Sequence, residues 1–208
     1  MNRYLILVFV TALIGGCATI YSSPDLDRRE KKHKQIAIVP IESTIKYNKL
    51  PKGVTIEQIE DMEIDMTYQF QDQLYIRFLK RSTEYRIDFQ DVEKTNLLLE
   101  KQGISGSNIS QYSKAVLAEI LGLDALISGK IISTKPMSTG TAIAVGVIFG
   151  VWGTTNQVDV TLSVHDGADS ELIWKYNHVY SGSVGSTPEN LTKELMKQIA
   201  RKFPYQLK

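Results

Sequence analysis

Three histidines, His33, His165 and His178, are the residues of this sequence best suited to acid–base chemistry or metal binding. His165 and His178 fall on opposite faces of the strands predicted below, so they cannot share a metal ion. No His, Cys, Asp or Glu cluster has ligand spacing, and the sequence contains neither a nucleophile elbow nor a P-loop. Gly182 and Gly185 precede a predicted helix without an accompanying lysine, so we interpret them as a turn rather than an anion site. We therefore predict a non-enzymatic protein with no catalytic residue, no metal and no cofactor.

The chemistry that the sequence does indicate is lipid modification of Cys17, the single cysteine of the chain. After a short positive start, Tyr4–Ile14 is apolar but too short to span a bilayer comfortably. Ile14, Gly15 and Gly16 then lead into Cys17, and small residues before a cysteine resemble a bacterial lipobox. We predict that signal peptidase II recognises these residues and cuts before Cys17. The alternative is a general secretory signal in which the cysteine is incidental.

The residues after the predicted cleavage site indicate where the protein resides. Ala18, rather than aspartate, follows the cysteine, which favours lipid anchoring in the outer membrane on its periplasmic face. Residues 17–34 are expected to form the lipidated tether, a flexible coil spanning roughly 20–25 Å. Loss of residues 1–16 removes one basic residue and leaves 23 basic and 23 acidic residues, so no nucleic-acid footprint is present.

Residues 35–208 are expected to form one α/β (α+β) layered domain with a mixed, mostly antiparallel sheet flanked by helices. Strands are predicted where apolar residues alternate or run continuously, and helices where they recur every three or four positions. The predicted strands are 35–41, 85–90, 124–134, 157–166 and 171–180, and the predicted helices are 55–82, 91–103, 108–122 and 186–203.

Two of these elements carry detailed expectations. Thr55 and Gln58 form a capping box for the first helix. Its buried stripe is predicted to contain Ile56, Ile59, Met62, Met66, Phe70, Leu74 and Phe78. In the hairpin of 157–166 and 171–180 the even positions are apolar, and a register that pairs Val164 with Leu172 and Leu162 with Trp174 buries Trp174. This register puts His178 opposite Val158.

Several phrases of the chain resemble the curli-secretion channel lipoprotein (CsgG) superfamily and the related amino-terminal domain of TolB. These are "IAIVPI", "YRIDFQDVEKTNLLLEKQG" and "SQYSKAVLAEILGLDALISGKI", with Gly122, Asp124 and the pair Ser128-Gly129 at matching places. Asp166 and Trp174 resemble the superfamily's Asp-turn-Trp hairpin. The resemblance spans roughly residues 35–208 and concerns structural motifs. Members of this superfamily are secretion channels, periplasmic adaptors or activators of peptidoglycan synthases.

An uncharged apolar stretch, Thr141–Gly153, interrupts the domain within a segment at about 137–156 that we expect to protrude from the sheet. As a strand, twelve residues reach about 40 Å and could form a membrane hairpin. As a helix they reach about 18 Å, too short to span, and Ala142, Gly146 and Gly150 form a small-residue stripe for close packing. Burial in the domain's own core is the third interpretation.

We favour a membrane or subunit contact for this stretch, and we predict a homo-oligomer. The candidate contact residues are Ala142, Gly146, Phe149, Gly150 and Trp152. The expected function is a subunit or adaptor of an envelope export or assembly complex, with other envelope proteins as partners. The alternatives are an activator that docks onto a peptidoglycan synthase, and a carbohydrate- or lipid-binding module.

Overall fold

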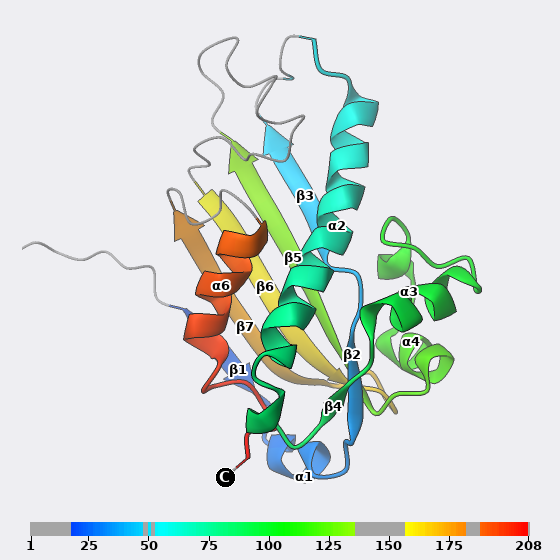
Figure 1. The fold of residues 1–208 in the computed structure, drawn as a ribbon, viewed down its shortest axis with the longest axis vertical. Helices are drawn as coiled ribbons and strands as arrows, with labels where there is room; N and C mark the ends of the chain where they lie inside the picture. Colours follow the sequence, from blue (N-terminus) through cyan, green and yellow to red (C-terminus); the bar gives the residue numbers. More distant parts are fainter. Residues whose placement is uncertain (1–17, 48–49, 51–52, 136–156, 182–187, 208) are drawn as a thin grey trace, which may run out of the picture.

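The computed structural model describes residues 18–47, 50, 53–135, 157–181 and 188–207 (Figure 1). As predicted, these residues form a single α/β domain with a seven-stranded mixed sheet, and five helices are seen in the described part. The strands are β1 Thr19–Ser22, β2 Gln35–Ile38, β3 Glu42–Tyr47, β4 Asp88–Phe89, β5 Ala125–Lys135, β6 Gln157–Asp166 and β7 Leu172–Ser181. The helices are α1 Leu26–Glu30, α2 Ile56–Leu79, α3 Val92–Glu100, α4 Lys114–Leu121 and α6 Pro188–Ile199.

Helices cover the sheet unequally on its two faces. The strand order is β1-β7-β6-β5-β2-β4, with β3 paired to β5 beyond the end of β2. Figure 1 shows α2 and α6 side by side across one face, which we call the inner face. Ile36 and Ile38 of β2 pack into that larger core, whereas Ala37 and Val39 pack on the other side with residues of α3 and α4. We call this second side, only partly covered by helices, the outer face.

Helix α2 confirms most of what its sequence predicts. The Thr55 hydroxyl accepts from the Gln58 N–H and the Gln58 side chain accepts from the Thr55 N–H, so the capping box is present. Of the predicted stripe, Ile59, Met66, Phe70, Leu74 and Phe78 are buried. Met62 is half-buried against the core, and Ile56 is 55% exposed because the first turn projects past the strands.

Strand β3 was not predicted, because its pairing depends on an irregularity beside Pro40. Ile38 pairs with Ile127, and Glu42 pairs with Lys130. Between these two pairs, the chain from β2 to β3 has three residues, whereas β5 has two. Proline has no N–H to donate to a ladder and is found at such bulges. β2 and β3 are thus two parts of one path along β5.

The expected flexible tether is wrong for the described residues 18–34, which pack on the domain. β1 pairs antiparallel with β7, from Thr19 opposite Asn177 to Ser22 opposite Trp174. Ile20 and the α1 residue Leu26 lie against the main core. This short segment therefore supplies enough apolar contact and strand pairing to be ordered on the edge of the sheet.

The predicted β6–β7 register has the correct parity but is displaced by two residues. Val164 pairs with Trp174 instead of Leu172, because an irregularity follows Val164 before the turn at Asp166. An even displacement keeps each side chain on its predicted face. Trp174 is accordingly fully buried on the inner face.

Two other predicted boundaries are corrected. The helix predicted from Asn108 begins only at Lys114, after the Ser113 hydroxyl accepts from the Val116 N–H. Asn108 instead caps the preceding loop, where its side-chain oxygen accepts from the Ser105 N–H. The strand predicted over 85–90 is reduced to the two residues of β4.

Trp174 should be a main contributor to the stability of this core. It stacks edge-on against Phe203 at 5.5 Å and parallel to Tyr176 at 6.4 Å. Trp174→Ala is expected to lower the free energy of unfolding by roughly 3–5 kcal/mol, since it removes a fully buried aromatic side chain. Val179→Ala, on the outer face of the same strand, is the control and should cost less than about 1 kcal/mol. Chemical denaturation measures both, and a Trp174→Ala change below about 1 kcal/mol would contradict the face assignment.

Candidate functional site

The site residues predicted from the sequence all lie outside the residues that the structure describes, and they remain predictions. The predicted lipidation and peptidase-recognition residues are Cys17, Ile14, Gly15 and Gly16. The predicted contact residues are Ala142, Gly146, Phe149, Gly150 and Trp152. Within the ranges that the structure does describe, no helix combines the length and the apolar character that crossing a membrane requires.

Two described strands flank segment 136–156, which contains the apolar stretch. β5 ends at Lys135 and β6 begins at Gln157, and Thr134 pairs with Gln157. The described residues that flank segment 136–156 are therefore one strand spacing apart, at the end of the sheet opposite the β6–β7 turn.

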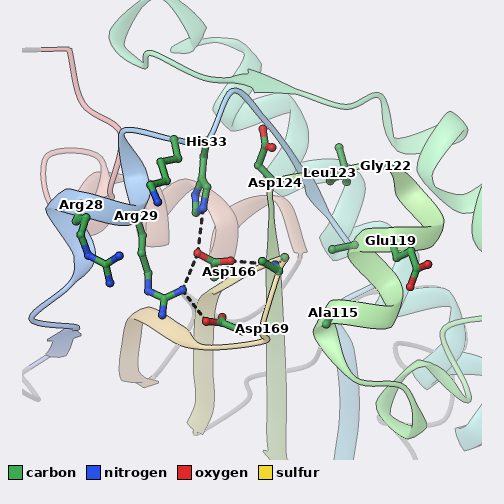
Figure 2. Close-up of a pocket in the computed structure, with 14 residues that line it drawn as sticks. Arg28, Arg29, His33, Ala115, Glu119, Gly122, Leu123, Asp124, Asp166 and Asp169 are labelled. Carbon is green, nitrogen blue, oxygen red and sulfur yellow. Dashed lines mark hydrogen bonds and ion pairs between the residues drawn. The ribbon is translucent and has the colours of Figure 1, made fainter.

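A polar cluster occupies the β6–β7 end of the sheet, beneath α1 (Figure 2). Arg29 of α1 bridges two carboxylates, with its Nη1 atom 2.9 Å from Asp166 Oδ2 and 2.8 Å from Asp169 Oδ2. The side chain of Asp166 is 9% exposed, whereas that of Asp169 is 49% exposed. The inner ion pair is therefore the one shielded from water.

His33 joins this cluster to the carboxyl-terminal end of the chain. Its Nε2 atom lies 3.3 Å from Asp166 Oδ2, and its Nδ1 atom lies 2.8 Å from the Tyr205 hydroxyl. His33 and Tyr205 are both buried, and burial raises the pKa of the Tyr205 hydroxyl. Glu30 completes the connection, since its carboxylate accepts from the Tyr205 N–H and pairs with Arg86 at 2.9 Å.

The turn after β6 holds Asp166 in its ionised form. Burial alone would raise the pKa of Asp166, but hydrogen bonds from the Ala168 N–H and from Arg29 hold it below its usual value. Gly167 is needed in this turn, because a Cβ atom there would lie 2.8 Å from both the Ala118 Cβ and the Leu123 carbonyl oxygen. The turn thus packs directly on α4 and positions the carboxylate under α1.

A pocket of about 730 Å³ adjoins the cluster, lined in part by Arg28, Lys32, Glu119 and Asp124 (Figure 2). Asp124 accepts from the Lys34 and Gln35 N–H groups, which fixes the start of β2. In the described part of the chain no three His, Cys, Asp or Glu side chains gather as metal ligands would. The arrangement is suited to joining chain segments, because Asp124, Asp166 and Asp169 already bind Arg29, His33 or backbone N–H groups.

The other two histidines make contacts of their own outside this cluster. His165 Nδ1 lies 3.2 Å from the Ser170 carbonyl oxygen. His178 lies opposite Val160 rather than the predicted Val158, and it stacks edge-on against Tyr180 at 4.5 Å. Burial lowers the pKa of His178, which favours a neutral ring.

Sequence reasoning missed His33 because it lies in a run of charges that is typical of a solvated linker. Its partner Asp166 is 133 residues away, and a single sequence does not reveal such a pairing. The local signals were the apolar residues Ile20 and Leu26, which are unusual in a solvated linker.

Comparisons with known proteins give only distant likenesses. No protein-family model and no curated protein matches the sequence. The fold is similar to the crystal structure of lipoprotein GNA1162 from Neisseria meningitidis, with 13% identity over 81% of this chain and 99% of that one and a TM-score of 0.45. It is similar to the PelC dodecamer from Paraburkholderia phytofirmans, with 13% identity over 93% and 99% and a TM-score of 0.46. It is also similar to the NMR structure of E. coli LpoB, with 8% identity over 76% and 64% and a TM-score of 0.40.

Asp166→Asn should destabilise the domain, because it removes the buried charge that pairs with Arg29 and lies in hydrogen-bond contact with His33. The expected loss is about 3 kcal/mol of unfolding free energy. Asp169→Asn is the matched control, since it touches the same arginine from an exposed position and should cost less than about 1 kcal/mol. Equal losses of unfolding free energy in the two variants would show that the buried Arg29–Asp166 pair stabilises the domain no more than the exposed pair does.

The same carboxylate predicts how stability depends on pH. A folded-state pKa below the unfolded value of about 3.9 stabilises the protein above that value, and this contribution is lost as the pH falls through the folded pKa. Between pH 6 and pH 3, the free energy of unfolding should therefore fall less steeply in Asp166→Asn than in the natural protein, as measured by chemical denaturation at each pH.

Proposed function

We propose that the chain is a non-enzymatic lipoprotein, anchored through Cys17 in the outer membrane on its periplasmic side. It acts there as a subunit or adaptor of an envelope export or assembly complex. The observation that carries the proposal is the position of β1, because the folded domain begins immediately after the predicted lipidation site.

The distance from the proposed anchor to the fold is very short. Ala18 already packs on the main core, and Thr19 pairs with Asn177 of β7. Two residues of extended chain span at most about 7 Å, compared with the roughly 20–25 Å of the tether expected from the sequence. A lipid on Cys17 would therefore hold the β1 edge of the sheet at the membrane surface.

This geometry favours a membrane-proximal complex over an activator of a peptidoglycan synthase. An activator anchored in the outer membrane must extend to the cell wall and beyond it. The Arg29–Asp166 pair and the His33–Tyr205 contact oppose such extension, because they hold the amino-terminal segment on the domain. Release of this segment would cost the buried charge pair.

Segment 136–156 is the proposed contact with neighbouring subunits. Its small stripe of Ala142, Gly146 and Gly150 would allow close approach of a partner's backbone, with Phe149 and Trp152 adding apolar area. Lys135 of β5 and Gln157 of β6, which flank the segment, lie at the end of the sheet opposite the β6–β7 turn and its polar cluster.

Crosslinking in intact cells tests the proposed function. A Gly/Ser linker of about 20 residues, inserted between Cys17 and Ala18, adds roughly 25 Å of reach without touching the fold. The natural protein should crosslink to integral envelope proteins, and the insertion should weaken these crosslinks severalfold. Cys17→Ser is the control that removes the lipid, and it should be released from washed membranes. Crosslinks to a peptidoglycan synthase that persist or increase with the insertion would instead support the activator.

Self-association is tested at the small-residue stripe. Gly146→Leu and Gly150→Leu add volume where a neighbour would approach, so both should abolish the oligomer while leaving the melting temperature unchanged. Val147→Leu changes the other side of the stretch and is the matched control. Native mass spectrometry of the detergent-extracted protein, with thermal melts, measures the result. A lowered melting temperature in a protein that is monomeric from the start would show that the stretch belongs to the domain core.

A further inference from the structure

The outer face of the sheet carries a group of lysines that take no part in the polar cluster around Asp166. Residues of β5, β6 and β7 alternate between the faces, so Lys130, Ser163 and Lys175 point away from α2 and α6. Ser163 pairs with Ser128 of β5 on one side and with Lys175 of β7 on the other. Ser128, Ser163 and Lys175 therefore form one row across the sheet. Lys130 follows one step along the strand, opposite Thr161.

Lys114, at the start of α4, adds a third ammonium group to this face. Burial lowers the pKa of Lys114, and the charge of Glu42 partly offsets this. Burial, and then the charges of Lys114 and Lys175, lower the pKa of His165. Helix α4 packs on this face, and the N–H of Ala115, next to Lys114, donates to the Ser170 hydroxyl in the β6–β7 turn. Lys130 lies 3.9 Å from Glu42.

Two of the ammonium groups on this face have no ion-pair partner. Among the described residues, Lys114 and Lys175 make no ion pair, Lys130 pairs with Glu42, and the other acids on or beside the neighbouring strands are Asp159 and Glu171. A half-buried ammonium group without an ion-pair partner is costly, and a bound anion would offset that cost.

Two buried hydroxyl groups lie between these lysines. Ser128 is 9% exposed and Ser163 is 8% exposed, and both side chains lie on the same face of the sheet as Lys130 and Lys175. Hydroxyl and ammonium groups together donate to the oxygens of a phosphoryl group.

The same face continues to the proposed anchor. Tyr21 of β1 pairs with Lys175 and is 45% exposed, and Val179 of β7 is 42% exposed on the same side. Cys17 precedes Thr19 of β1 by two residues. Exposed apolar side chains beside lysines are typical of surfaces that lie in the headgroup region of a bilayer.

We propose that this outer-face patch, comprising Lys114, Lys130, Lys175, Ser128 and Ser163, binds the phosphoryl groups of anionic phospholipids. The lipids are those of the leaflet that holds the Cys17 anchor, so the inference rests on the anchoring part of the proposed function. The lipid anchor fixes one point of the domain, and the patch fixes which face lies against the membrane.

Residue-resolved amine labelling of the natural lipidated protein tests this orientation. The protein is reconstituted on phosphatidylcholine vesicles with or without phosphatidylglycerol, and acetylation of each lysine is followed by mass spectrometry. Phosphatidylglycerol should slow labelling of Lys114, Lys130 and Lys175 by about fivefold or more. An anionic surface strengthens the binding of each nearby lysine by roughly that factor. Lys193 and Lys202, on or just after α6, should label at unchanged rates.

Two double variants distinguish binding at the patch from a general effect of the protein's net charge. In Lys114→Gln with Lys175→Gln, the protection of Lys130 should be lost. In Lys193→Gln with Lys202→Gln, which removes the same charge elsewhere, it should persist. Equal loss in both would overturn the proposal.

Two further measurements test whether the patch binds free phosphate instead of lipid, and whether the lipid anchor holds. Inorganic phosphate added to phosphatidylcholine vesicles should protect no lysine, and protection as strong as that by phosphatidylglycerol would assign the patch to free phosphate instead. Flotation with the vesicles reports the anchor independently. A protein that floats but shows no protected lysines overturns this inference alone, whereas a protein that fails to float overturns the anchor as well.

Discussion

The carboxylate of Asp166 is the group on which the ordering of both chain ends depends. It accepts from the Ala168 N–H, pairs with Arg29 and contacts His33, which in turn contacts Tyr205. A carboxylate that is nine-tenths buried is tolerated only when its partners are in place. The β6–β7 turn, the amino-terminal segment and the carboxyl-terminal residues are therefore ordered together.

This coupling changes the mechanical character of the protein. With α1 and His33 held on the domain, β1 stays paired along β7, and no slack remains between the sheet and the predicted lipid on Cys17. A charged linker of the same length, free in solution, would leave the domain mobile over tens of ångströms. The ion pairs thus order a segment that has the composition of a tether as an edge of the fold, which agrees with the fixed position in an assembly that we propose.

Long periodic segments could be predicted from the sequence, and the segments that depend on distant partners could not. α2, β5, β6, β7 and α6 were predicted because each contains enough repeats of its own pattern. β1 and β3 are short, and β3 additionally follows the bulge at Pro40, so their identity comes from the strands they pair with. The same reason explains the polar cluster: Asp166 was noticed within a turn motif, but the burial of His33 is set by a contact across 133 residues. The predicted lipidation and contact residues lie outside the described ranges, so the fold neither supports nor opposes them directly.

The orientation proposed for the outer face also bears on the apolar stretch. If the patch and β1 lie against the leaflet, the strands run along the membrane surface rather than toward its interior. The ends of β5 and β6, at Thr134 and Gln157, then point sideways. A membrane hairpin would require the strands to tilt steeply into the bilayer, which would withdraw the lysines from the headgroups. The two proposals therefore support each other, since an outer face bound to phospholipid favours a subunit contact over insertion for residues 141–152.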